Sequence, residues 1–434
     1  MKTIGIDIGT TNTKVLLYDS SAATVLAKVS AVTPIVESSE WGKVRNAEEL
    51  FSLVNLLILE LSKNIDLSDV AGLSVSSVGE EIVLVDASGQ VVCPIVPWFD
   101  PRSWDEQTRF IEEFGMNLFH GINPGSWYSL FKLLWLKKNH PRAIEETTIF
   151  TDVGSFILGR LSGSYVMDWS HASRTGAFDL ELKAWSRDII QASGLPTDIF
   201  PALVPPGTKI GVIEQELGDK LGLPPKVIVC SGGHDHFCAA YAGGVRNAGD
   251  ALVSAGTSEA CFILLEHPIP NVQSRFPVEQ GCFVDQNLYY LMISIPSGHQ
   301  FQQWKSLIYP TGEDEMIYAE MSSVPMGCDG HKFMLDDSLI NWTLSGSSRF
   351  FDRGTIMRAI QEGLGRVSRE VVQELFSFSE REGNLYVAGK PVKQPFWLNL
   401  RSEIYGRDLY VIPEVEAASL GVALMASAVT NILH

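Results

Sequence analysis

The sequence is poor in basic residues. It contains 33 lysines and arginines against 51 aspartates and glutamates, so its formal net charge is −18. A chain with this charge repels nucleic acid and anionic membranes unless a local basic patch compensates. The densest basic stretch, residues 132–142, holds only Lys132, Lys137, Lys138 and Arg142. We therefore expect neither nucleic acid nor a membrane as a partner.

Cysteine pairs and long apolar runs are also missing. The cysteines form no C-x-x-C pair and no zinc-type spacing with histidine; they are Cys93, Cys230, Cys238, Cys261, Cys282 and Cys328. No apolar run is long enough to span a bilayer, and the N-terminus shows no signal-peptide pattern. These features are typical of a cytoplasmic protein with reduced thiols.

The composition supports two packed domains. The chain has 434 residues, 45% of them apolar and 19% charged, whereas single cores stop growing at roughly 250–300 residues. Alternating isoleucines predict a strand over residues 3–8, and leucine spacing predicts a helix over residues 48–62. Strands and helices alternate from there, which indicates the α/β class. We expect a boundary near residue 245, giving domains 1–245 and 246–434.

The opening pattern recurs in the second half. Residues 250–258 predict a strand that enters a Gly-Thr-Ser turn, as residues 3–11 enter a Gly-Thr-Thr turn. Backbone N–H groups and hydroxyls at such glycine turns can bind phosphate oxygens. A single turn of this kind is more often an ordinary hairpin, but its recurrence favours two phosphate loops. The expected phosphate-binding residues are Gly9, Thr10, Thr11, Asn12, Lys14, Gly256, Thr257 and Ser258. Asp7, just before the first turn, would hold a hydrated Mg²⁺ on the phosphates.

Two further strand ends carry candidate functional groups. Asp235 follows Gly232-Gly233-His234 at the end of an apolar strand, where α/β proteins present functional side chains. It is either a general base or a cap of the next helix. Ala388, Gly389 and Lys390 end the strand that begins at Leu385, and small residues there leave room for an adenine. An ordinary β–α turn is the alternative.

The ordered set of motifs resembles the FGGY carbohydrate kinases, along nearly the whole chain. The motifs are Asp7–Lys14, Gly232–Asp235, Ser254–Ser258 and Ala388–Lys390, with Pro97–Arg102, Asp168–Ser173 and Arg358–Gly363 as weaker elements. The resemblance implies two ribonuclease-H-like domains of the actin/hexokinase type around a central cleft. It also implies Asp235 as catalytic base, Asp7 as the Mg²⁺-linked acid and Gly389 as an adenosine contact. The usual second glycine beside Gly389 is missing here.

The candidate substrate contacts lie in the first domain. Glu80 follows the strand that covers residues 73–77, Trp98 and Asp100 follow another strand, and His234 and His236 flank Asp235. A carboxylate can accept two sugar hydroxyls, and a tryptophan face can cover the apolar side of a sugar. Glu81 would point away from Glu80. Glu80 and Glu81 could instead form a solvated turn, and one histidine could be structural.

The sequence thus predicts an ATP- and Mg²⁺-dependent kinase of a small neutral sugar or polyol, such as a ketopentose or pentitol. Closure about residues 243–245 would exclude water from the reaction. An actin- or chaperone-type ATPase and a sugar sensor without activity are the alternatives. A homodimer is left open.

Overall fold

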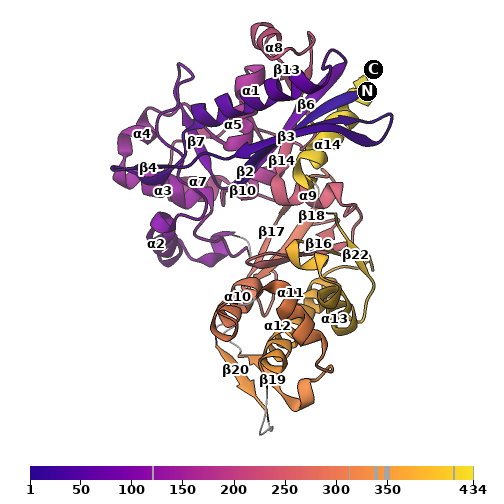
Figure 1. The fold of residues 1–434 in the computed structure, drawn as a ribbon. Coiled ribbons are helices and arrows are strands. Elements are labelled where there is room, and N and C mark those ends of the chain that lie inside the picture. Colours follow the sequence, from indigo (N-terminus) through magenta and orange to yellow (C-terminus); the bar gives the residue numbers. More distant parts are fainter. Residues whose placement is uncertain (120–121, 312, 337–340, 347–351, 414–415, 434) are drawn as a thin grey trace.

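The computed structural model contains two six-stranded sheets, one in each half of the chain (Figure 1). It describes residues 1–434 except 120–121, 312, 337–340, 347–351, 414–415 and 434. In Figure 1 the indigo and magenta elements of the first half lie above the orange elements of the second. The α/β class and the ribonuclease-H-like duplication predicted from the sequence are confirmed.

The first sheet has the strand order β13-β14-β6-β1-β2-β3. Its strands are β1 (Lys2–Ile8), β2 (Asn12–Asp19), β3 (Thr24–Val32), β6 (Val70–Ser77), β13 (Lys209–Val212) and β14 (Ile228–His234). β1 and β14 both run parallel to β6, while β1 and β2 form an antiparallel hairpin. The carboxyl ends of β1 and β14 therefore lie at the same edge of the sheet.

The second sheet repeats this plan, with the order β17-β18-β16-β15-β21-β22. Its strands are β15 (Ala251–Ala255), β16 (Glu259–Leu265), β17 (Val278–Cys282), β18 (Tyr289–Ile295), β21 (Leu385–Ala388) and β22 (Leu409–Val411). β15 and β16 form the antiparallel hairpin, and β21 runs parallel to β15. The predicted copy of the opening hairpin in the second half is confirmed.

The helices pack around these sheets. Those of the first half are α1 (Ala47–Asn64), α2 (Trp104–Phe114), α3 (Ser129–Asn139), α4 (Pro141–Glu145), α5 (Val153–Ser162), α6 (Trp169–Ala172), α7 (Arg187–Ser193), α8 (Gln215–Leu221) and α9 (Asp235–Ala242). Those of the second half are α10 (Ser297–Ile308), α11 (Asp314–Ser322), α12 (Arg353–Ser377), α13 (Pro395–Tyr405) and α14 (Ala417–Leu433). Short two-stranded sheets complete the fold: β4 (Val36–Ser38) with β5 (Gly42–Val44), β7 (Ile82–Val85) with β8 (Ile149–Asp152), β9 (Val166–Asp168) with β12 (Ala202–Val204), β10 (Phe178–Asp179) with β11 (Ala184–Trp185), and β19 (Lys332–Leu335) with β20 (Trp342–Ser345).

Helix α1 shows how local sequence and packing agree. The side chain of Asn46 accepts the N–H groups of Glu48 and Glu49, so the helix begins with a satisfied cap. Leu50 and Leu57 are among the buried residues that recur at helical spacing and pack against the first sheet. The predicted helix over residues 48–62 is confirmed within two residues at each end.

The last helix returns to the first half of the molecule. In Figure 1 the yellow α14 lies beside β1 and β6, close to the N-terminus. Thr3 donates a hydrogen bond to the carbonyl of Ala423 (2.9 Å). A Cβ on Gly5 would lie 1.9 Å from the carbonyl oxygen of Ser419, so only glycine allows this close contact. A division at residue 245 would leave α14 in the second domain; we propose that it belongs with residues 1–245.

Candidate active site

Two carboxylates from separate strands meet in one cavity. Asp7 lies near the end of β1, and Asp235 is the first residue of α9, directly after β14. The cavity has a volume of about 850 Å³ and is lined by Asp7, Lys14, Asp235, His236, Ala239, Ala240, Leu252, Ser254, Ala388, Gly389, Ile412, Pro413, Ala417 and Ala418. It therefore combines predicted catalytic and metal residues of the first half with the predicted adenosine strand of the second.

Asp7 is a buried carboxyl group whose charged form is disfavoured by its surroundings. Ser76 donates a hydrogen bond to its Oδ1 (3.0 Å). Burial, followed by the negative charge of Asp235, raises the pKa of Asp7 to about 7. A divalent cation would relieve both effects, and carboxylate oxygen is a ligand type that Mg²⁺ prefers. The donor chemistry of Asp7 thus fits the predicted ion.

Asp235 is held in its ionised form by the two histidines beside it. Nδ1 of His234 lies 3.0 Å from Oδ1 of Asp235, and the N–H of His236 donates to the same oxygen (2.6 Å). Burial would raise the pKa of Asp235, but the charge and hydrogen bond of His234 outweigh it and lower the pKa. Asp235 in turn raises the pKa of His234 against the effect of burial. The side chain of His234 takes the cap position of α9, and both contacts of the Asp235 carboxylate named above are made by Oδ1.

The two glycines before Asp235 serve packing. A Cβ on Gly232 would lie 1.7 Å from the carbonyl oxygen of Val75, and one on Gly233 would lie 2.5 Å from the side chain of Val284. Only glycine lets β14 approach β6 and the second half this closely. The strand itself ends directly before Asp235, where the sequence analysis expected it.

In each of the two predicted phosphate loops, the N–H of the glycine donates a hydrogen bond to a carbonyl of the same loop. The N–H of Gly9 donates to the carbonyl of Asn12 (3.1 Å), and that of Gly256 donates to the carbonyl of Ser258 (3.0 Å). Thr11, Asn12 and residues 256–258 are exposed, so their polar groups can reach a ligand. Thr10 is engaged differently, because its Oγ1 accepts a hydrogen bond from Nε1 of Trp98 (3.0 Å).

A second cavity adjoins the first on the far side of Gly389. It measures about 1060 Å³ and is lined by Ala255, Gly256, Thr257, Glu259, Ser297, Gly298, Phe301, Gln302, Asp314, Tyr318, Gln361, Leu364, Lys390, Pro391, Gln394, Trp397 and Arg401. Gly389 has a φ of 103°, and a Cβ there would lie 2.1 Å from the carbonyl oxygen of Ala255. Glycine at this position thus keeps the end of β21 in contact with the predicted phosphate loop. The first cavity, on one side, holds the two acids Asp7 and Asp235. The second cavity, on the other side, has a size suited to a nucleoside.

Glu80 and Glu81 are buried, with exposed fractions of 4% and 2%. Nε of Arg174 donates to Oε1 of Glu80 (2.7 Å), whereas Nε of Arg45 donates to Oε2 of Glu81 (3.0 Å). The two carboxylates point to different partners, as expected, and the alternative of a solvated turn is wrong. Burial would raise the pKa of Glu80, but Arg174 and His234 hold it below its usual range.

Asp100 is occupied by a neighbouring arginine. Its two oxygens accept from Nε and Nη2 of Arg102 at 2.8 and 2.7 Å, and it caps the 3-10 turn Pro101–Ser103. A carboxylate used in this way has little capacity left for a sugar, so we leave Asp100 out of the proposed substrate contacts.

His236, unlike Asp100, has a polar atom that is left without a partner in the described part of the chain. Its Nε2 is buried without a hydrogen-bond partner among the described residues, in a residue that lines the acidic cavity.

The sequence analysis missed a buried cluster behind Glu80. Arg174 bridges Glu80 and Glu279, and the Tyr128 hydroxyl donates to Glu279 (2.9 Å). Arg174 directly follows the Asp168–Ser173 motif, so the motif could have pointed to it. Glu279 lies on β17, and its pairing depends on a contact between the halves that no local pattern indicates.

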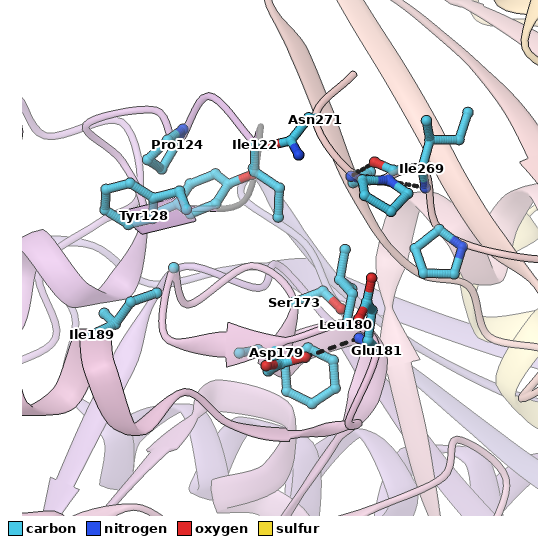
Figure 2. A pocket seen from close by; sticks show the side chains of 16 residues that line it. Ile122, Pro124, Tyr128, Ser173, Asp179, Leu180, Glu181, Ile189, Ile269 and Asn271 are labelled. Carbon is cyan, nitrogen blue, oxygen red and sulfur yellow. Dashed lines mark hydrogen bonds between the residues drawn. The ribbon is translucent and has the colours of Figure 1, made fainter. Parts of the chain in front are cut away.

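A third cavity, of about 750 Å³, lies between the halves (Figure 2). Tyr128, Ser173 and Leu180 of the first half face Ile269 and Asn271 of the second. None of the residues predicted to bind sugar, phosphate or metal lines it, so it is separate from the two cavities above.

Two kinds of feature are missing from the described residues: a membrane-spanning helix and a cluster of metal ligands. Across the described ranges, no helix combines the length and apolar character needed to cross a bilayer. Over the same part of the chain, no three His, Cys, Asp or Glu side chains gather as a set of metal ligands.

Known proteins resemble this chain in sequence and in fold. The model of the N-terminal domain of the FGGY family of carbohydrate kinases matches residues 2–242. The xylulose kinase of Bacillus subtilis is 25% identical, over 98% of this chain and 87% of its own. The L-fuculokinase of Escherichia coli O157:H7 is 26% identical, over 96% and 90%.

Solved structures agree on the fold. The xylulose kinase of Rhodospirillum rubrum has a TM-score of 0.91 at 21% identity, covering 99% of this chain and 90% of that one. The glycerol kinase of Plasmodium falciparum with ADP has a TM-score of 0.87 at 20% identity, with the same coverages. The curated relatives are sugar kinases, which favours the kinase over the ATPase alternative. Since the family model spans more than half of the chain, this protein belongs to the FGGY family of carbohydrate kinases.

Proposed function

We propose that this protein transfers the γ-phosphoryl group of ATP to a hydroxyl of a small neutral sugar or polyol, with Asp235 as general base. The observation that carries the proposal is the meeting of Asp7, Asp235 and the Ala388–Gly389 strand end in one cavity between the halves. A base and a metal-linked acid on one side of a cleft, with a nucleotide strand on the other, are the parts that phosphoryl transfer needs.

In the proposed reaction the Asp235 carboxylate accepts the proton of the substrate hydroxyl. The hydroxyl oxygen bonds to the γ-phosphorus, the bond from that phosphorus to the bridging oxygen breaks, and ADP leaves. Because the transition state is loose, orientation matters more than basicity, and the lowered pKa of Asp235 is compatible with this role. Mg²⁺, held by Asp7 through water, would neutralise charge on the β- and γ-phosphates.

The phosphates would lie between the two hairpin tips. Gly9, Thr11, Asn12 and Lys14 would contact them from the first half. Gly256, Thr257 and Ser258 would do so from the second half, with Ala388, Gly389 and Lys390 beside the nucleoside. Exposure of both tips and the cavities on either side of Gly389 support this assignment. Domain closure about residues 243–245 would bring the tips together; Gly244, with a φ of 97°, adopts a conformation that favours glycine.

The charges near the base favour a neutral substrate. Arg174 is already neutralised by its ion pairs with Glu80 and Glu279. A sugar acid would need an unpaired Arg or Lys for its carboxylate. Glu80, His234, His236 and Trp98 are suited to hydroxyl groups and to the apolar face of a ketopentose or pentitol.

An ADP-release assay over ketoses, polyols and sugar acids tests the proposal. We expect strong stimulation by one or a few neutral sugars and none by sugar acids. ATP turnover that no small sugar changes would favour an ATPase, and no turnover with any of them would favour a sensor.

The role of Glu80 gives a prediction on substrate affinity. Arg174 takes Oε1 of Glu80, whereas Nε2 of His234 approaches Oε2 only to 3.8 Å, so Oε2 is suited to accept a sugar hydroxyl. Glu80→Gln should lower kcat/KM for the sugar by about ten- to a hundred-fold, because hydrogen bonds to charged groups contribute about 1.5–3 kcal/mol. KM for ATP should stay nearly constant. Steady-state kinetics on the best sugar of the panel check this, and an unchanged sugar KM would remove Glu80 from the site.

The raised pKa of Asp7 gives a prediction on stability. In the folded protein this carboxyl keeps its proton up to a pH of about 7, whereas its ordinary pKa is 3.8. Between these values the folded state binds more protons than the unfolded state, so the contribution of Asp7 to stability falls as the pH rises from 4 to 7. Asp7→Asn should therefore raise the Tm of the metal-free protein, with a gain that grows up to pH 7 and then levels off.

Thermal melts of both proteins from pH 4 to 8, with and without Mg²⁺ and ADP, provide the measurement. The wild type should gain more stability from Mg²⁺ with ADP than Asp7→Asn does. Equal melting curves at every pH would show that Asp7 carries no electrostatic stress.

A further inference from the structure

A buried arginine joins the proposed sugar site to the other half of the molecule. Nη2 of Arg174 lies 2.6 Å from Oε1 of Glu80, and its Nη1 pairs with Oε2 of Glu279. Glu80 follows β6 in the first half, whereas Glu279 lies on β17, the edge strand of the second sheet. The exposed fractions of the Arg174, Glu80 and Glu279 side chains are 7%, 6% and 12%.

The surroundings fix this arginine tightly. The Tyr128 hydroxyl donates to the same oxygen of Glu279 (2.9 Å), and the guanidinium of Arg174 lies over the Tyr128 ring, 4.9 Å from its centroid. Buried ion pairs are costly when one partner is lost, because the other charge stays behind unpaired. Separating β17 from the first half would therefore leave Arg174 paired with Glu80 alone, and the Arg174–Glu80 pair would lose its anchor on the second half.

We infer that Arg174 is a positioning residue that couples sugar binding to the contact between the two halves. The inference rests on the proposed function, since it requires Glu80 to bind the sugar. Arg174 occupies one oxygen of Glu80 and turns the other toward His234, whose Nδ1 contacts the base Asp235. Glu279 supplies the anchor from the second half. A sugar on Glu80 and the closed contact at Glu279 then stabilise each other, as linkage requires.

The same boundary has room for movement. The cavity in Figure 2 runs along it, and Tyr128 forms part of its wall. Other links also hold the halves here: the N–H of Asn123 donates to the carbonyl of Val278 (3.2 Å), and the N–H of Cys282 donates to Oγ of Ser173 (2.9 Å). Nζ of Lys183 donates to the carbonyl of Gln286 (2.8 Å). Packed interiors resist deformation, so a boundary that holds a cavity is a suitable place for a shift between two arrangements.

The test is a substitution that lies away from the substrate. Glu279→Gln keeps an acceptor for Tyr128 but removes the charge that anchors Arg174. We expect KM for the sugar to rise about ten-fold, with kcat and KM for ATP changed by less than about three-fold. Glu80→Gln combined with Glu279→Gln should raise KM no further than Glu80→Gln alone, because the effect of Glu279 passes through Glu80.

Glu362→Gln is the matched control. Glu362 is a fully buried glutamate of α12 that pairs with Arg358 and Arg366, so the same change tests general loss of a buried ion pair. It should lower the Tm without changing the sugar KM. If Glu279→Gln fails to fold, Tyr128→Phe removes the hydroxyl that donates to Glu279 and should raise the sugar KM to a smaller extent.

The outcomes separate the two proposals. A normal sugar KM in folded Glu279→Gln or Tyr128→Phe, alongside a raised KM in Glu80→Gln, overturns the coupling and leaves the kinase proposal standing. Effects of Glu80→Gln and Glu279→Gln that multiply also overturn it. A wild-type protein without sugar-dependent turnover overturns both.

Discussion

Asp235→Asn should lose most of its turnover while keeping both substrates bound. A positioned general base typically contributes about 10²–10⁴-fold, so we expect kcat to fall by this factor. The amide has the shape of the carboxylate and can still accept the N–H of His236, so the local fold should persist. Calorimetry should show near-normal ATP affinity, because in the proposed reaction Asp235 contacts the hydroxyl and not the nucleotide.

The control for this variant is Asp86→Asn, a half-buried turn aspartate that accepts the N–H groups of Ser88 and Gln90. Its kcat should match that of the wild type. Near-normal kcat in Asp235→Asn would show that the carboxylate only supports the start of α9 and that the base lies elsewhere.

Gly389→Ala should abolish most nucleotide binding. The new Cβ would lie 2.1 Å from the carbonyl oxygen of Ala255, below any contact that real Cβ atoms make, so the phosphate loop or the strand must move. The φ of 103° adds backbone strain of order 1–3 kcal/mol for a residue other than glycine. We expect the Kd for ATP to rise by about a hundred-fold or more, since a displacement of both loop and strand removes contacts on two sides of the nucleotide.

Gly406→Ala is the control that separates the effect of backbone strain from the effect of a steric clash. Gly406 also has a positive φ, at 65°, but a Cβ there meets nothing within 4 Å. This variant should lose some stability and bind ATP normally. Unchanged ATP affinity in folded Gly389→Ala would count against the assignment of the nucleotide to this strand.

Much of the frame was predictable because it depends on local signals. The hairpins around Gly9 and Gly256 follow from alternating apolar strands and glycine turns, and the helix from Ala47 follows from its cap and leucine spacing. These signals act within a few residues. The position of Asp235 at a strand end followed from the same reasoning.

Contacts between distant segments were not predictable in this way. Nothing local in the sequence shows that α14 packs on Gly5. The pairing of Arg174 with Glu279 depends on how the two halves meet. Burial of Glu80 and Glu81 likewise follows from arginines that approach from other elements.

The central claim is that this chain moves a phosphoryl group from ATP to a sugar hydroxyl by means of Asp235. The most direct measurement is ³¹P NMR of the enzyme with ATP, Mg²⁺ and the best sugar of the panel, run in parallel with Asp235→Asn. We predict one sugar phosphate for each ADP formed by the wild type, and almost none of either product from the variant in the same time. Inorganic phosphate as the main product, or equal sugar phosphate from both proteins, would contradict the account.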